Sequence, residues 1–106
     1  ATWCGPCRRW LPIVAKAQRA LAGKGVVVYA VNERESSMQV HAYLKSQGLT
    51  IPVLMDRSGR VGSDYGASSI PLTVIIGRDG HVVKTMLGLH QEDDLRGALA
   101  EAGVTW

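Results

Sequence analysis

The spacing of apolar residues in the first third of the chain predicts a helix followed by a strand. Apolar residues recur every three or four positions over residues 7–22, which is typical of an amphipathic helix, and the glycines that follow should end it. Pro12 lies inside this segment and is expected to kink it, because proline has no amide donor. Residues 26–31 form a continuous, β-branched apolar run, which predicts a buried parallel strand.

The middle of the chain contains a second helix signal and weaker signals for a strand, a turn and a short helical turn. Ser36 and Gln39 have the spacing of a capping box, and Gly48 is a suitable helix stop. An edge strand, a turn and a short helical turn are expected over residues 51–55, 56–59 and 60–66.

The last third predicts a hairpin and a closing helix. Residues 72–76 and 81–86 are strand-like and flank Asp79-Gly80, a pair that suits a tight turn between antiparallel strands. Residues 92–102 begin with three acidic side chains and then show helical periodicity. The resulting order, α-β-α-(β)-β-β-α, predicts one α/β domain over residues 1–106, with a layered sheet.

The start of the chain leaves this sheet without an expected strand. The strand at 26–31 and the hairpin at 72–86 have no obvious common neighbour, because no strand-forming residues precede the first helix. Each unpaired buried backbone group costs about 1–3 kcal/mol. We therefore expect the domain to be N-terminally incomplete, lacking at least one strand from a longer protein; alternatively, a partner chain donates a strand.

Composition and charge fit a globular domain and narrow its partners. Apolar residues make up 46% of the 106 positions and charged residues 20%. The formal net charge is +3, but no run of basic residues exceeds two, so nucleic acid is not an expected partner. No apolar stretch is long enough to span a membrane.

The chemistry of the chain centres on Cys4 and Cys7, spaced C-x-x-C at the start of the first helix. Cys4 is expected at or beside the N-cap, where free amide groups and the helix dipole favour a thiolate. This position makes Cys4 the nucleophile, and Cys7, one turn further in and expected to be less exposed, the resolving thiol. Pro6 suits the first helical turn, and Gly5 leaves room for a partner backbone.

Two other interpretations of the cysteine pair fit the sequence less well. A zinc site would need two more ligands, and the histidines do not have zinc-finger spacing. They are His41, His81 and His90, all expected at the surface. A purely structural disulfide would not explain why the pair caps a helix and follows a tryptophan. We expect no metal, and no cofactor beyond a redox-active Cys4–Cys7 disulfide.

Several motifs resemble those of a known family. They are "WCGPC", "VVYAVNERES", "LTIPVLMD" and "YGASSIPLTVIIGRDGHVV". Together they make the chain similar to the thioredoxin superfamily, and more narrowly to the TlpA/ResA/DsbE (CcmG) group of thiol-disulfide oxidoreductases. The resemblance implies a three-layer thioredoxin-like fold with a mixed sheet flanked by helices, in which the strand before W-C-x-x-C is central.

The resemblance also implies roles for individual residues. Cys4 matches the attacking cysteine and Cys7 the resolving one. Pro71 matches a cis-proline that faces the disulfide and turns the backbone of Ile70 outward, toward an extended substrate. The residues implied to contact substrate are Trp3, Gly5, Pro6, Ile70 and Pro71.

Three positions depart from the family pattern. Trp10 occupies the place where members often carry a glutamate that could accept the proton of Cys7. Glu35 is a candidate acid/base residue, although a solvated loop charge is the simpler interpretation. Leu72 follows the proline where thioredoxins usually have threonine.

The resemblance implies a disulfide reductase that acts through a mixed disulfide. Its substrates would be protein thiols and disulfides, an upstream thiol reductant would recharge it, and cytochrome c maturation is one task of the family. It further implies an extracytoplasmic monomer, with room for a membrane anchor outside this sequence. The alternative is a non-catalytic peptide-binding module in which the cysteines form a structural disulfide.

Overall fold

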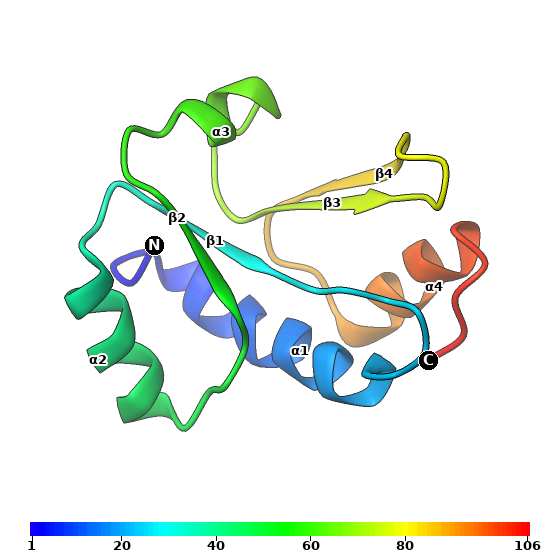
Figure 1. Cartoon of the computed structure of the whole chain (residues 1–106), viewed down its shortest axis with the longest axis horizontal. Coiled ribbons are helices and arrows are strands. Elements are labelled where there is room, and N and C mark those ends of the chain that lie inside the picture. The colour runs from blue at the N-terminus through cyan, green and yellow to red at the C-terminus, as the bar shows by residue number, and fades with distance from the viewer.

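The computed structural model describes all 106 residues and shows helices and strands in the expected order (Figure 1). In chain order the elements are α1 (Gly5–Leu21), β1 (Ala30–Glu33), α2 (Ser37–Gln47), β2 (Val53–Asp56), α3 (Arg60–Asp64), β3 (Leu72–Ile76), β4 (Val82–Leu87) and α4 (Glu92–Glu101). The α/β class is therefore confirmed. No helix has the length and apolar character needed to cross a membrane.

The strands form two separate pairs. β1 runs parallel to β2 with Ala30 opposite Val53, and β3 runs antiparallel to β4 with Leu72 opposite Leu87. The strands thus include both parallel and antiparallel pairing, and no backbone hydrogen bonds join β1 to β3. This arrangement fits the lack of a common neighbour inferred from the sequence, while a strand upstream stays a prediction.

The prediction of a buried strand at 26–31 was wrong about the position of the strand and about its burial. The ladder with β2 begins only at Ala30 and continues to Glu33, because residues 26–29 have no strand beside them. The side chains of Val27 and Tyr29 are 73% and 54% exposed. The β-branched composition of this run predicts a strand, but strand pairing and burial depend on a neighbouring strand, which residues 26–29 lack.

The helix ends follow the local signals closely. α1 begins at Gly5, directly after the N-cap Cys4, ends at Leu21 and continues without a break through Pro12. Ser36 and Gln39 form the expected capping box of α2, and Gly48 ends that helix in the left-handed conformation with φ 64°.

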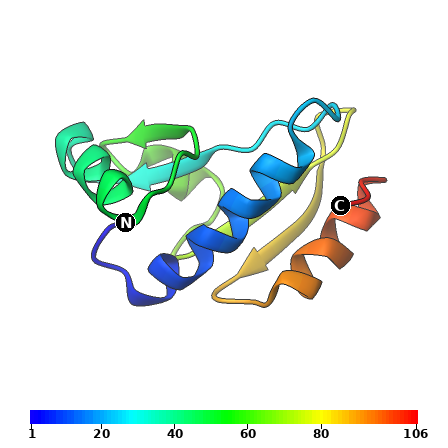
Figure 2. The same ribbon diagram turned by 90° about the horizontal axis from the view of Figure 1, so that it is seen from below.

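The main core lies where α1 packs against the β3–β4 hairpin and α4. Figure 2 shows α1 crossing the molecule between α2 on one side and α4 on the other. The core side chains are Trp10, Ala17, Leu21, Ile75, Met86, Leu95, Ala98 and Leu99. Because α1 carries Cys7 and three core residues and is capped by Cys4, this packing fixes the helix end at which the cysteine pair lies.

A buried carboxylate fastens the segment that leads to Pro71. Asp56 ends β2 and is 5% exposed. It accepts hydrogen bonds from the backbone amides of Val61 and Gly62, at 3.2 and 2.8 Å. These bonds satisfy free N–H groups in α3 and tie that short helix to β2.

Candidate active site

The cysteine pair is a disulfide at the N-terminus of α1. Cys4 is the N-cap residue, as predicted, and is bonded to Cys7 with a Cα–Cα distance of 5.2 Å. The backbone amide of Cys7 donates to Cys4 Sγ at 3.2 Å. On reduction, the same amide and the helix dipole would favour the thiolate form of Cys4.

A segment distant in sequence completes the site. The Ile70–Pro71 peptide bond is cis. The Ile70 carbonyl oxygen lies 3.8 Å from Cys4 Sγ, which is a contact and not a hydrogen bond while Cys4 is in the disulfide. The structure thus places Ile70 and Pro71 beside a cysteine that is 66 positions away.

A cleft of about 440 Å³ opens at this junction. Its walls come from the residues around Cys4, from the end of β1 and from the segment before Pro71. The lining residues are Trp3, Cys4, Gly5, Pro6, Glu33, Ala67, Ser68, Ser69 and Ile70. A Cβ added to Gly5 would meet no atom within 4 Å, so internal packing does not require glycine at that position.

Exposure of the two cysteines is opposite to what helix position suggested. Cys4 is 5% exposed, whereas Cys7 is only half-buried. The reason is tertiary: Cys4 lies against Ile70, a contact that is invisible from its place at the helix start. Trp3 is 73% exposed and lines the cleft, so the side chain that faces solvent here is Trp3 and not Cys4.

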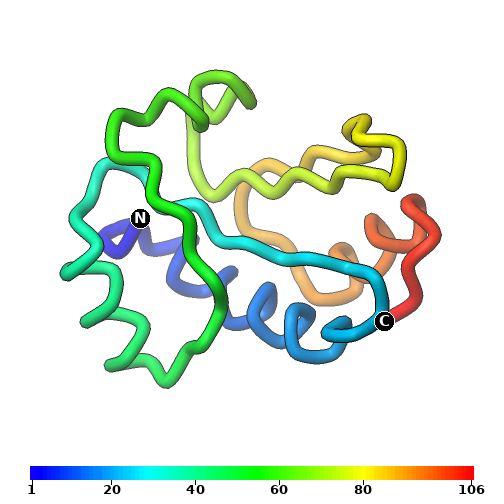
Figure 3. The backbone as a smooth tube through the Cα atoms, in the orientation of Figure 1, coloured from blue at the N-terminus to red at the C-terminus, as the bar shows by residue number.

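Glu35 does not line the cleft but holds the segment before the cysteines. Its carboxylate accepts hydrogen bonds from the Thr2 backbone amide at 2.6 Å, the Thr2 hydroxyl at 2.5 Å and the Asn32 side chain at 3.0 Å. Figure 3 shows the N-terminal segment lying beside the loop that follows β1. Glu35 is therefore not a free, solvated charge, and its direct contacts are with Thr2 and not with the cysteines.

The family of the chain follows from comparison with known proteins. The model of the Redoxin family matches residues 1–100. The chain belongs to the Redoxin family. The chain is 37% identical over 91 residues to the thiol-disulfide oxidoreductase ResA of Bacillus subtilis (strain 168). The matched region covers 86% of the chain and 51% of that relative. For ResA of Geobacillus thermodenitrificans, identity is 33% over 95 residues, covering 90% and 55%. The chain thus spans about half the length of these curated relatives.

Solved structures confirm the thioredoxin-like fold of the Redoxin chain. StoA from Bacillus subtilis superposes with a TM-score of 0.79 at 27% identity, covering 92% of this chain and 75% of StoA. The exposed lipoprotein thioredoxin Etrx1 of Streptococcus pneumoniae gives 0.80 at 30% identity, covering 95% and 78%. The resemblance to the ResA/DsbE group is likewise confirmed.

Trp10, three residues after Cys7, is a core residue. Its side chain is 3% exposed, points into the core and donates from Nε1 to the Thr73 hydroxyl at 2.8 Å. The position therefore couples α1 to β3 and offers no proton acceptor to Cys7. Leu72, the other departure, begins β3 and is half-buried.

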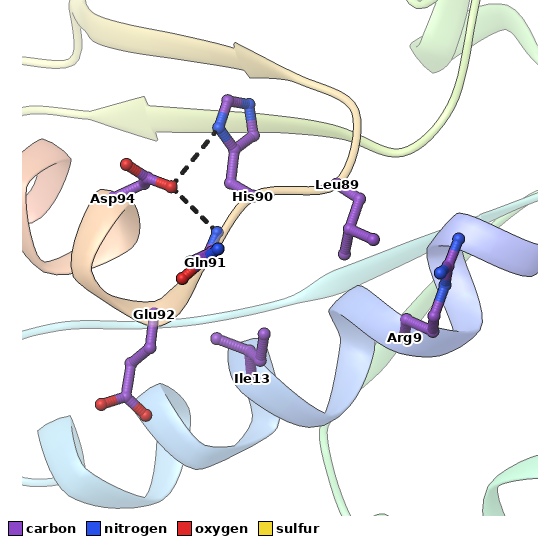
Figure 4. A pocket seen from close by; sticks show the side chains of 7 residues that line it. All are labelled: Arg9, Ile13, Leu89, His90, Gln91, Glu92 and Asp94. Carbon is purple, nitrogen blue, oxygen red and sulfur yellow. Dashed lines mark hydrogen bonds and ion pairs between the residues drawn. The ribbon is translucent and has the colours of Figure 1, made fainter.

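A larger groove of about 670 Å³ lies away from the cysteines, between α1 and the start of α4. Figure 4 shows Ile13 and Leu89 on its walls and Asp94 bonded to the Gln91 amide and paired with His90. Its Glu92 pairs with Lys16 at 2.6 Å. The polar groups here thus mainly make contacts at the N-terminus of α4.

The three histidines lie in different parts of the fold. His41 and His81 are exposed, on α2 and in the hairpin turn, and His90 lies in the loop before α4. No three side chains of the metal-binding types converge anywhere in the chain.

The contacts of Glu35 predict a pH-dependent stability. Partial burial would raise its pKa, but the hydrogen bonds from Thr2 and Asn32 outweigh this and lower the pKa below the ordinary value of 4.5. A lowered pKa stabilises the fold above pH 4.5, and that stabilisation disappears as the pH falls through the folded-state pKa. Glu35→Gln is therefore expected to be less stable than wild type near neutral pH, with the gap closing in acid.

Urea denaturation at several pH values down to about pH 3 checks this prediction. Glu101→Gln removes a surface carboxylate elsewhere and is the matched control. A constant gap between wild type and Glu35→Gln across the pH range would contradict the assignment.

Proposed function

We propose that this chain is the catalytic domain of a thiol-disulfide oxidoreductase that reduces protein disulfides. The observation that carries the proposal is the Cys4–Cys7 disulfide at the N-terminus of α1, in a cleft shared with Ile70. Support comes from relatives that are themselves named thiol-disulfide oxidoreductases. The cleft is open on one side to an extended substrate segment, which could pair with the backbone at Ile70.

In the first step, the Cys4 thiolate attacks one sulfur of the substrate disulfide. A Cys4–substrate mixed disulfide forms, and the other substrate sulfur leaves as a thiolate and takes a proton from solvent. Trp3, Gly5 and Pro6 line the cleft at this point, so they would contact the substrate around its sulfur.

In the second step, the Cys7 thiolate attacks Cys4 Sγ. The Cys4–Cys7 disulfide forms, and the second substrate sulfur leaves as a thiolate. Two electrons have then passed from the protein to the substrate, and an upstream thiol reductant must return them. Cys7 is half-buried, so solvent can take its proton in this scheme, whereas Trp10 faces the core and Glu35 is hydrogen-bonded to Thr2.

The proposal extends to the direction of electron transfer and to the cellular location of the protein. Gly5 and Pro6 between the cysteines are the pair that thioredoxin uses, and its potential of about −270 mV is reducing. We propose an extracytoplasmic location, supported by the likeness to an exposed lipoprotein. Maintenance of reduced thiols during cytochrome c maturation is the proposed task, and a monomer the proposed state.

Turbidimetric reduction of insulin by dithiothreitol tests the proposal. The purified protein should accelerate precipitation of the insulin B chain well above the uncatalysed rate. A rate equal to the protein-free reaction would overturn the proposal and favour a peptide-binding module with a structural disulfide.

A further inference from the structure

Glu33 provides an acidic side chain in the cleft that the proposed reaction does not use. It is the last residue of β1 and lines the cleft together with Cys4 and Ile70. It carries the only formal charge among the lining side chains, since the others are tryptophan, proline, isoleucine and small residues. The chain as a whole has a formal net charge of +3, so the negative charge at the cleft is a local feature.

The place of the Glu33 carboxylate depends on a glycine in α3. A Cβ added to Gly62 would collide with Glu33 Oε1, so the carboxylate occupies the space that a side chain at this position would fill. Gly62 is buried, and its amide is already bonded to Asp56 at 2.8 Å. The side chain of Glu33 is therefore packed against a fastened backbone and does not extend freely into solvent.

The Glu33 carboxylate makes no side-chain hydrogen bond or ion pair, although its charge acts on the Ala1 ammonium and partly offsets the burial that lowers the pKa of that group. Its neighbour across the β1–β2 ladder, Asp56, accepts two backbone hydrogen bonds. Glu33 takes part in none of the five ion pairs, and no Lys, Arg or His nitrogen lies within 4 Å of it. A half-buried carboxylate that makes no ion pair attracts a cation and repels an anion that enters the cleft.

We propose that Glu33 is a specificity-determining residue that favours substrates with a lysine or arginine beside the disulfide. This inference rests on the proposed reductase function. A substrate sulfur must reach Cys4, and the substrate chain must pass Ile70, so the residues next to that sulfur enter the space that Glu33 lines. Attraction at a partly solvated site raises kcat/KM for cationic substrates and lowers it for anionic ones.

Three disulfide-bonded peptides that differ only in one residue beside the cysteine test the inference, with lysine, glutamine or glutamate at that position. Wild type should reduce the lysine peptide with a kcat/KM roughly three- to tenfold above that of the glutamate peptide. Glu33→Gln should bring this ratio close to one, and Glu33→Lys should invert it. About 0.5 M salt should shrink the wild-type preference.

Glu101→Gln, which makes the same charge change on α4, should leave the ratio unchanged and serves as the control. The glutamine peptide separates the two proposals. If wild type reduces it but Glu33→Gln retains the full lysine preference, the specificity inference is overturned and the reductase function stands. If wild type reduces none of the peptides, the reductase function falls, and the specificity inference falls with it.

Discussion

Cys4→Ser is expected to lower the protein-catalysed rate of insulin reduction by roughly three orders of magnitude or more, which leaves the rate of dithiothreitol alone. A serine hydroxyl remains protonated at neutral pH and does not attack a disulfide, whereas the N-cap position of Cys4 favours a thiolate. The substitution removes one sulfur atom and keeps a residue that is well suited to an N-cap, so α1 should still form. A circular dichroism spectrum like that of wild type would show that folding is intact.

Cys7→Ser is the matched variant, and it should fail in a different way. Cys4 can still attack the substrate, but no second thiol is present to release it, so the mixed disulfide should accumulate. Non-reducing electrophoresis with a disulfide-bonded peptide would show a covalent adduct for Cys7→Ser and none for Cys4→Ser. Adduct formation by Cys4→Ser instead would mean that the nucleophile is Cys7, which is the more exposed cysteine in the oxidised structure.

Trp10→Ala should be the most damaging substitution outside the cysteine pair. The Trp10 side chain is 3% exposed and joins α1 to the β3–β4 hairpin and α4 in the core. Truncation of a large buried aromatic side chain costs about 3–5 kcal/mol. Because small domains have a total stability of only ~5–15 kcal/mol, the variant should be largely unfolded or strongly shifted in urea denaturation.

Trp10→Phe separates packing from hydrogen bonding. It keeps an aromatic ring in the core but removes the indole N–H that donates to the Thr73 hydroxyl. Since Thr73 is half-buried and can bond to water instead, the expected loss in the free energy of unfolding is about 1–2 kcal/mol. A loss as large for Trp10→Phe as for Trp10→Ala would show that the Thr73 bond, and not packing, carries the effect.

The elements with strong local signals were predicted correctly. The capping box at Ser36 and the Asp79-Gly80 turn depend on contacts between residues close in sequence, so the pattern contains the cause of the structure. The strand expected at 26–31 was misplaced because a strand is defined by its neighbour, and only residues 30–33 have one.

In the candidate site, too, some features could be predicted from the sequence and others could not. The helix-capping position of Cys4 follows from the spacing of "WCGPC", and residue resemblance pointed to Ile70 and Pro71. Glu33 was missed because nothing in "VNERES" distinguishes it from Glu35. In the folded chain Glu33 lines the cleft and packs against Gly62 of α3, while the hydrogen bonds of Thr2 hold Glu35 elsewhere.

The sequence by itself determined the α/β class, the helix ends and the identity of the redox pair, because periodicity, capping and cysteine spacing act over a few residues. The tertiary structure decided which cysteine is covered, which glutamate faces the cleft and which strands are paired. These properties depend on contacts between segments as far apart as Cys4 and Ile70, and the local pattern of side chains does not record such contacts.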